Sequence, residues 1–159
     1  MISALDDLNC FTHFNRLCNK NSWVLAIPEI VINEIKNHID FSKFTGELTF
    51  RTYHVNMQDL IKFRNRFPLL AEGELAVLFL VLHYKESDIK AVSATAILDD
   101  KAARNVAKKL GISYFGTLKL LKFMLDSNVI TKSQFYAFLS KLKDSGFRFT
   151  DEIVRRIVK

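Results

Sequence analysis

Short, fully apolar segments alternate with helix-like segments, and this alternation constrains the fold more than any other feature. The apolar segments span residues 2–6, 23–27, 91–99 and 112–116, and a partly alternating segment spans residues 47–55. A strand that is apolar at every position is buried on both faces, as in a parallel sheet covered by helices. The sequence therefore predicts an α/β fold with a central parallel sheet and helices on both faces, in a single domain over residues 1–159.

Helical periodicity fills most of the chain between and after these strands. We expect helices over residues 9–17, 28–39, 57–70, 71–84, 100–111, 117–129, 131–146 and 150–159. Pro28 suits the first turn of its helix, and Gly111 and Gly146 suit helix ends. The segment 71–84 is apolar almost all round, so it should be a buried helix.

The composition narrows the class of protein. Hydrophobic residues make up 49% of the chain, with 14 Phe and only two Pro and five Gly, which is typical of a densely packed protein. The longest apolar run, residues 75–82, is far shorter than the roughly 20 residues of a membrane-spanning helix. The N-terminus lacks the basic region of a signal peptide, and Cys10 and Cys18 are too few for a disulfide framework. We therefore expect a cytoplasmic protein with no membrane partner.

Carboxylates lie at the ends of expected strands, at the start of an expected helix and in the middle of another. They are Asp6, Asp7, Glu34, Glu72, Glu74, Asp99 and Asp100. In open α/β sheets, functional groups gather at the carboxyl ends of the strands. Clustered carboxylates are hard oxygen ligands of the kind that Mg²⁺ or Mn²⁺ requires, and such ions neutralise phosphate charge and activate water. The residues themselves thus predict an acidic metal site at one edge of the sheet.

Each acid also has a purely structural interpretation. Asp99 or Asp100 would cap the next helix, and Asp100 would pair with Arg104 one turn later. Glu74 suits the positive end of a helix dipole. The metal site is favoured by the conjunction of acids from four segments. Of the acidic pair, we expect Asp99 to bind the metal, because it ends the strand, and Asp100 to cap the helix, with the reverse assignment as the alternative.

Several short motifs occur in an order that a known family shares. They read DLNCF at 7–11, IPEIVINEI at 27–35, EGELAVLFL at 72–80, ILDDKAARNVAKKLGI at 97–112, GTL at 116–118 and GFRFTDEIV at 146–154. On these motifs the chain resembles the PIN-domain family, and within it the prokaryotic PIN-like branch related to VapC-type toxins. The resemblance runs from about residue 2 to the end of the sequence.

The resemblance implies a metal-dependent endoribonuclease that is the toxin of a type II toxin–antitoxin pair. The implied catalytic residues are Asp7, Glu34, Glu74, Asp99 and Asp100, and the implied ligands of Mg²⁺ or Mn²⁺ are Asp7, Glu74 and Asp99 or Asp100. Asn9 and Thr117 would orient a ligand or the water. The implied partners are an RNA substrate and a cognate antitoxin protein, with a homodimer as a further option. The alternative is a catalytically inactive PIN-like module that binds nucleic acid or protein.

Basic residues follow the acidic pair along one helix face. Lys101, Arg104 and Lys108 share this face, and the chain carries a net charge of +6, which favours polyanions. We expect the three side chains to bind RNA by positioning its phosphates. The alternative is an ordinary solvated face, which is how we interpret Lys62 and Arg66, because nothing ties them to the acids.

Overall fold

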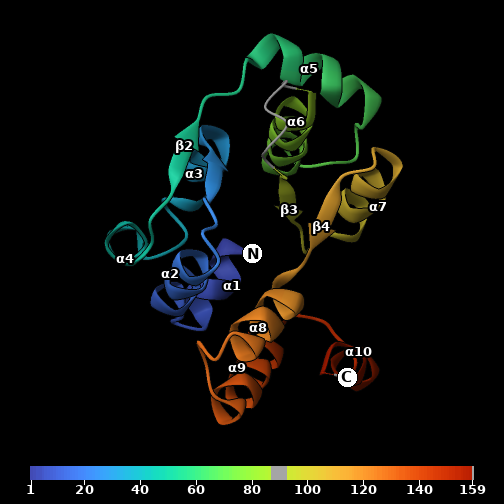
Figure 1. Cartoon of the computed structure of the whole chain (residues 1–159). Helices are drawn as coiled ribbons and strands as arrows, with labels where there is room; N and C mark the ends of the chain where they lie inside the picture. Colours follow the sequence, from blue (N-terminus) through green and yellow to red (C-terminus); the bar gives the residue numbers. More distant parts are fainter. Residues whose placement is uncertain (87–92, 159) are drawn as a thin grey trace. The chain divides into compact units, whose positions relative to one another are not determined.

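The computed structural model describes residues 1–86 and 93–158, in which helices and short strands are mixed (Figure 1). This arrangement confirms the predicted α/β class. No described helix is long and apolar enough to cross a membrane. The described chain divides into two compact units, and each is presented by itself. Unit 1 consists of Met1–Leu25, His38–Thr49 and Thr117–Lys159, and unit 2 consists of Ala26–Asn37 and Phe50–Gly116. The prediction of a single domain over residues 1–159 stays a prediction.

Unit 2 contains the described strands, and all of them pair in parallel. β1 (Ala26–Pro28) pairs with β2 (Arg51–Tyr53), and β3 (Thr95–Ile97) pairs with β4 (Ser113–Phe115). The expected central sheet is therefore present, among the described residues, as two separate two-stranded sheets. Each strand is only three residues long, and a pair this short depends on packed helices for its stability.

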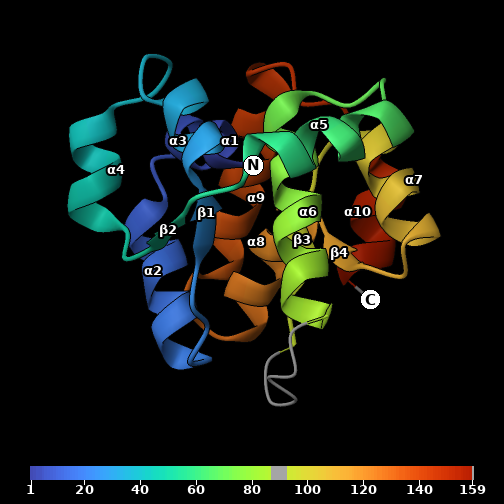
Figure 2. The same ribbon diagram turned by 90° about the horizontal axis from the view of Figure 1, so that it is seen from above.

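Helix α6 (Glu72–Glu86) organises unit 2. It contacts β1, β3, α3 (Glu29–Ile35), α5 (Met57–Arg66) and α7 (Lys101–Lys109), and its place beside β3 can be followed in Figure 2. Leu75, Ala76 and Leu78 in α6 are fully buried, as expected for a helix that is apolar almost all round. Burial of this helix fixes the position of its first turn, where the candidate site lies.

Unit 1 is helical. Its helices are α1 (Ile2–Asp7), α2 (Phe11–Lys20), α4 (Phe41–Glu47), α8 (Thr117–Asp126), α9 (Lys132–Asp144) and α10 (Asp151–Val158). Phe11 and Phe44 pack edge to face in its core, with ring centroids 5.5 Å apart. Thr131 begins α9 with the reciprocal hydrogen bonds of a capping box.

The expected strand over residues 2–6 is wrong, because this segment is helix α1. Ile2, Leu5 and Leu8 are buried at a spacing of three residues, which is the period of a helix face and not of a strand. A short apolar run fits a buried strand and a buried helix equally well, so periodicity alone could not separate them. Asp7 therefore ends a helix rather than a strand.

The expected strand over residues 23–27 begins later, at Ala26, and Pro28 ends it and precedes α3. Trp23 and Val24, which were expected inside this strand, are exposed. The strand expected over residues 91–99 forms at Thr95–Ile97, and its residues 91 and 92 lie outside the described part of the chain.

Left-handed residues terminate several helices. Asn9, Ser22, Gly111, Asn128 and Gly146 have positive φ angles. In each case the residue's own N–H and that of the following residue donate to carbonyl groups of the preceding helical turn, for example Asn9 to Asp6 and Cys10 to Leu5. This is the Schellman arrangement, which satisfies the carbonyl groups at a helix end. Asn9 therefore has a structural role in ending α1.

Candidate metal centre

Glu34 lies at the end of α3, with its carboxylate against the first turn of α6. Its Oε1 accepts a hydrogen bond from the Gly73 N–H at 3.0 Å. A Cβ atom at position 73 would lie only 2.3 Å from Glu34 Oε2, so the carboxylate occupies the space that a side chain would need. The free N–H groups at a helix start favour a carboxylate in this position.

Glu74 is half-buried in the same turn, and its Oε2 accepts a hydrogen bond from the Ala71 N–H at 3.0 Å. Burial raises the pKa of Glu74, and the negative charges of Asp100 and Glu34 raise it further, against the lowering effect of the Ala71 hydrogen bond. Carboxylates from three separate segments of unit 2 are thus close enough to repel one another's charge.

Asp100 caps helix α7, as expected from the sequence. Its Oδ1 accepts a hydrogen bond from the Ala103 N–H at 2.8 Å. The structural alternative of an ion pair between Asp100 and Arg104 does not form, because Arg104 Nη1 donates instead to the main-chain oxygen of Asp99 at 2.9 Å. Arg104 thereby ties the end of the β3 segment to α7.

The side chain of Asp99 lies next to Gly116, at the end of the β4 segment. A Cβ atom at position 116 would lie 2.9 Å from Asp99 Oδ1 and 3.2 Å from the main-chain oxygen of Leu98. The two segments are also joined by a hydrogen bond of 2.8 Å from the Leu98 N–H to the Phe115 carbonyl. The position of Asp99 therefore depends on glycine at 116.

The remaining predicted site residues are distributed over both units. Asp7 and Asn9 are exposed at the end of α1 in unit 1, and Thr117 is fully buried at the start of α8. Lys101 and Lys108 are exposed on α7 in unit 2. The roles predicted for these five residues in binding a metal or RNA stay predictions.

The acidic side chains of unit 2 fit a hard divalent cation in their chemistry. Glu34, Glu74 and Asp100 each have one oxygen fixed by a main-chain N–H, and the second oxygen accepts no hydrogen bond from the described residues. A cation would offset the burial and the repulsion from Asp100 and Glu34 that together raise the pKa of Glu74. Within residues 1–86 and 93–158, however, no three acidic, His or Cys side chains are gathered into a complete ligand set.

Gly73 and Gly116 are structural residues of the site that were quoted in the sequence motifs without a role of their own. Each leaves room for the carboxylate of an acid that lies far from it in the sequence, Glu34 and Asp99 respectively. The available signal was a glycine directly beside an acidic or polar residue at the start of a helix, at 73–74 and 116–117. The sequence could not show which carboxylate each glycine accommodates.

Parallel strand pairs, a buried helix and converging carboxylates define an α/β protein with an acidic candidate centre. A family model described as a PIN domain matches residues 2–159, and the chain belongs to this family. No match was found among the curated proteins or among the solved structures. PIN domains are generally nucleases, and they typically depend on divalent metal ions.

Proposed function

We propose that the chain is a metal-dependent endoribonuclease that hydrolyses RNA phosphodiester bonds. The observation that carries the proposal is the set of carboxylates that main-chain N–H groups hold in unit 2, those of Glu34, Glu74 and Asp100, in a chain of the PIN-domain family. Perturbed carboxylates that come from separate segments are typical of functional sites. An acidic centre in a chain of net charge +6 suits a cation together with a polyanionic substrate.

The proposed ligands are Asp7, Glu74 and the pair Asp99 and Asp100, with Mg²⁺ or Mn²⁺ as the ion. The ion would supply charge neutralisation at the phosphodiester and a more acidic water. Main-chain N–H groups hold one oxygen each of Glu74 and Asp100, so these carboxylates are oriented before substrate binds. We assign to Asn9 and Thr117 the orientation of a ligand or the water.

Glu34 and the basic residues of α7 have further roles in the proposed nuclease. Glu34 is held against α6 by Gly73, and we assign it to proton or ligand positioning at the reacting phosphate. Lys101, Arg104 and Lys108 on α7 would position the phosphates on either side of the scissile bond.

A cleavage assay with matched variants tests the proposal. The wild type should cleave single-stranded RNA with Mg²⁺ or Mn²⁺ and not in excess EDTA, and Asp7→Asn and Glu74→Gln should each lower the rate at least about 100-fold. Glu72→Gln is the control, because Glu72 lies in the same turn but is exposed and paired with Arg64 at 3.4 Å. Full cleavage in EDTA or by Glu74→Gln would rule the proposal out. The same assay with single-stranded DNA identifies a DNA nuclease instead.

The inactive binding module remains the second candidate, favoured by the absence of a complete ligand set among the described residues. It predicts RNA or protein binding that does not depend on a divalent ion. A rise in the melting temperature (Tm) with Mn²⁺ that disappears in Glu74→Gln would count against it.

We further propose that the nuclease is the cytoplasmic toxin of a type II toxin–antitoxin pair, active as a monomer or homodimer. The support is the resemblance of its motifs to VapC-type toxins. Co-expression with the protein of the neighbouring reading frame should abolish RNA cleavage, and a stable complex should be recovered. Unchanged cleavage in its presence would contradict this pairing.

A further inference from the structure

Trp23 is held in an exposed position just after helix α2. Ser22, with a φ of 54°, ends the helix, and the Trp23 N–H donates to the Cys18 carbonyl at 2.9 Å. The residue nevertheless has 40% of its surface exposed, and it is the single Trp of the 159 residues. Trp23 therefore presents part of a large aromatic side chain at the surface of unit 1.

A second aromatic ring contacts Trp23 within unit 1, and two lysines lie near this pair, beside Phe123 and Ser127. The rings of Trp23 and Phe123 meet edge to face, with centroids 5.8 Å apart, and Lys119 Nζ lies 5.4 Å from the Phe123 centroid. Lys20 Nζ donates to the Ser127 carbonyl at 2.6 Å. We call Trp23, Phe123, Lys119 and Lys20 the Trp23 patch.

The lysines of the Trp23 patch keep their positive charge available. Lys119 and Lys20 form no ion pair with the described residues, since Lys20 bonds to a neutral carbonyl. The nearby acid Asp126 is paired with Lys122. A partner surface without negative charge would bury both ammonium groups unpaired, whereas a polyanion pairs with them and releases counterions.

We propose that the Trp23 patch binds single-stranded RNA, with one base stacked on Trp23 and flanking phosphates at Lys119 and Lys20. Aromatic platforms flanked by basic side chains bind single strands in this way, because every base presents a π-face. The inference rests on the proposed function and adds a second contact for the same substrate, one that holds RNA without taking part in its cleavage.

The fluorescence of Trp23 reports directly on this contact. A 10-nucleotide single-stranded RNA added in EDTA, where no cleavage occurs, should quench the emission, because a stacked base deactivates the excited indole. An RNA duplex of equal charge, whose bases are already stacked, should quench much less. Equal quenching by the duplex, or none by the single strand, would overturn the proposal.

Binding of a fluorescently labelled RNA, measured by anisotropy in EDTA, separates the contribution of the aromatic ring from that of the lysine charge. Trp23→Ala should weaken the affinity by about fivefold or more and Trp23→Phe by less, as loss of one stacked base predicts. Lys119→Gln should weaken binding and make it less dependent on salt. The slope of the logarithm of the binding constant against the logarithm of the salt concentration should become less steep by about 0.7.

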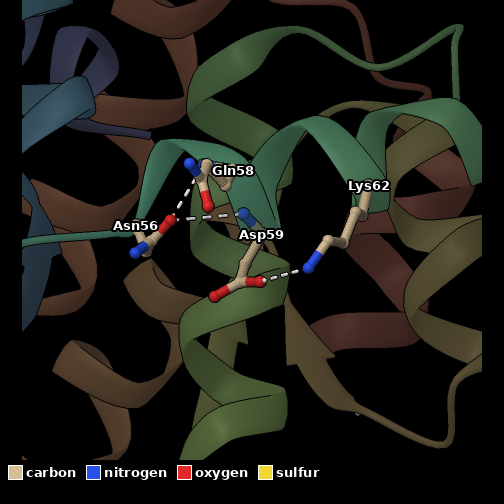
Figure 3. Close-up of polar contacts among 4 residues, drawn as sticks. All are labelled: Asn56, Gln58, Asp59 and Lys62. Carbon is tan, nitrogen blue, oxygen red and sulfur yellow. Dashed lines mark hydrogen bonds and ion pairs between the residues drawn. The ribbon is translucent and has the colours of Figure 1, made fainter.

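The control is Lys62→Gln, which removes one positive charge from α5, where Lys62 Nζ lies 3.1 Å from Asp59 Oδ1 (Figure 3). It should leave the affinity and the quenching unchanged. Should Trp23→Ala bind RNA like the wild type, or dissociate a dimer in light scattering without changing RNA affinity, the patch is a protein interface and the proposal is wrong. Glu74→Gln separates the two proposals. It should lose RNA cleavage, which tests the proposed function, and keep RNA binding that depends on Trp23, which tests the patch.

Discussion

The Gly73 N–H donates to Glu34 Oε1 across 39 residues of sequence, and the carboxylate fills the space above the glycine Cα. Gly73→Ala would place a Cβ 2.3 Å from Glu34 Oε2, and the flexible carboxylate would move away. We expect RNA cleavage to fall by up to about 100-fold, since misplacing a catalytic group by about 1 Å has this effect. The Tm should change by less than about 3 °C, because alanine favours the helix while the hydrogen bond is lost.

Gly46→Ala is the matched control for this substitution. Gly46 is also helical, in α4, and a Cβ there meets nothing within 4 Å. It should stabilise the chain by up to about 1 kcal/mol and leave cleavage unchanged. A loss of cleavage in Gly46→Ala equal to that in Gly73→Ala would show that the effect is not specific to Glu34.

Gly116→Ala should both destabilise the chain and impair the site. Its Cβ would lie 3.2 Å from the Leu98 carbonyl oxygen, which belongs to the main chain and cannot turn aside, and 2.9 Å from Asp99 Oδ1. Overpacking of this kind costs about 1–3 kcal/mol, so differential scanning fluorimetry should show a Tm lower by about 2–8 °C. An unchanged Tm would mean that the β3 and β4 segments can separate without cost.

Asp100 combines a helix cap with a charge near Glu74, and two substitutions separate these contributions. Asp100→Ala should lower stability by about 1 kcal/mol through loss of the bond to the Ala103 N–H, whereas Asp100→Asn keeps an acceptor. Both should abolish the Mn²⁺-dependent rise in Tm. Asp40→Ala removes the comparable cap of α4, where Oδ1 accepts from the Lys43 N–H, and should leave the Mn²⁺ response intact. A full response in Asp100→Asn would limit Asp100 to capping.

The raised pKa of Glu74 predicts a pH dependence with a defined sign. Folded Glu74 holds its proton more tightly than unfolded Glu74, so its contribution to stability is present at low pH and is lost as the pH rises through the folded pKa. In EDTA, the Tm of Glu74→Gln relative to the wild type should therefore increase from pH 4 to pH 7. With added Mn²⁺ at pH 7, the wild type should instead have a higher Tm than Glu74→Gln. A Tm difference that does not vary with pH would show that folding does not raise the pKa of Glu74.

Local signals predicted much of the fold. The all-apolar pattern of α6, the Asp100 cap of α7 and the glycines after α7 and α9 are each a property of a few neighbouring residues. Residues 2–6 were predicted wrongly because five residues do not distinguish the two periodicities. The exposed Trp23 was assigned to a strand because apolar character alone does not show that the chain turns at Ser22.

The candidate site was predictable as a set of residue types and not as an arrangement. Carboxylates at segment ends indicated Glu34, Glu74, Asp99 and Asp100, and the structure brings the charges of Glu34 and Asp100 to Glu74. The glycine that accommodates Glu34 is determined by packing between α3 and α6, which no local pattern encodes. The contact of Arg104 with the main-chain oxygen of Asp99, in place of an ion pair with Asp100, has the same origin.

The division of the chain into units has a consequence for its synthesis. The sequence passes from one unit to the other after Leu25, Asn37, Thr49 and Gly116, so neither unit is a continuous fragment. Gly116 is the last residue of unit 2, and the final three helices of unit 1, α8, α9 and α10, are synthesised after it. Because α8 and α9 contact α2 and α1, unit 1 can complete its core only after these late helices have been made.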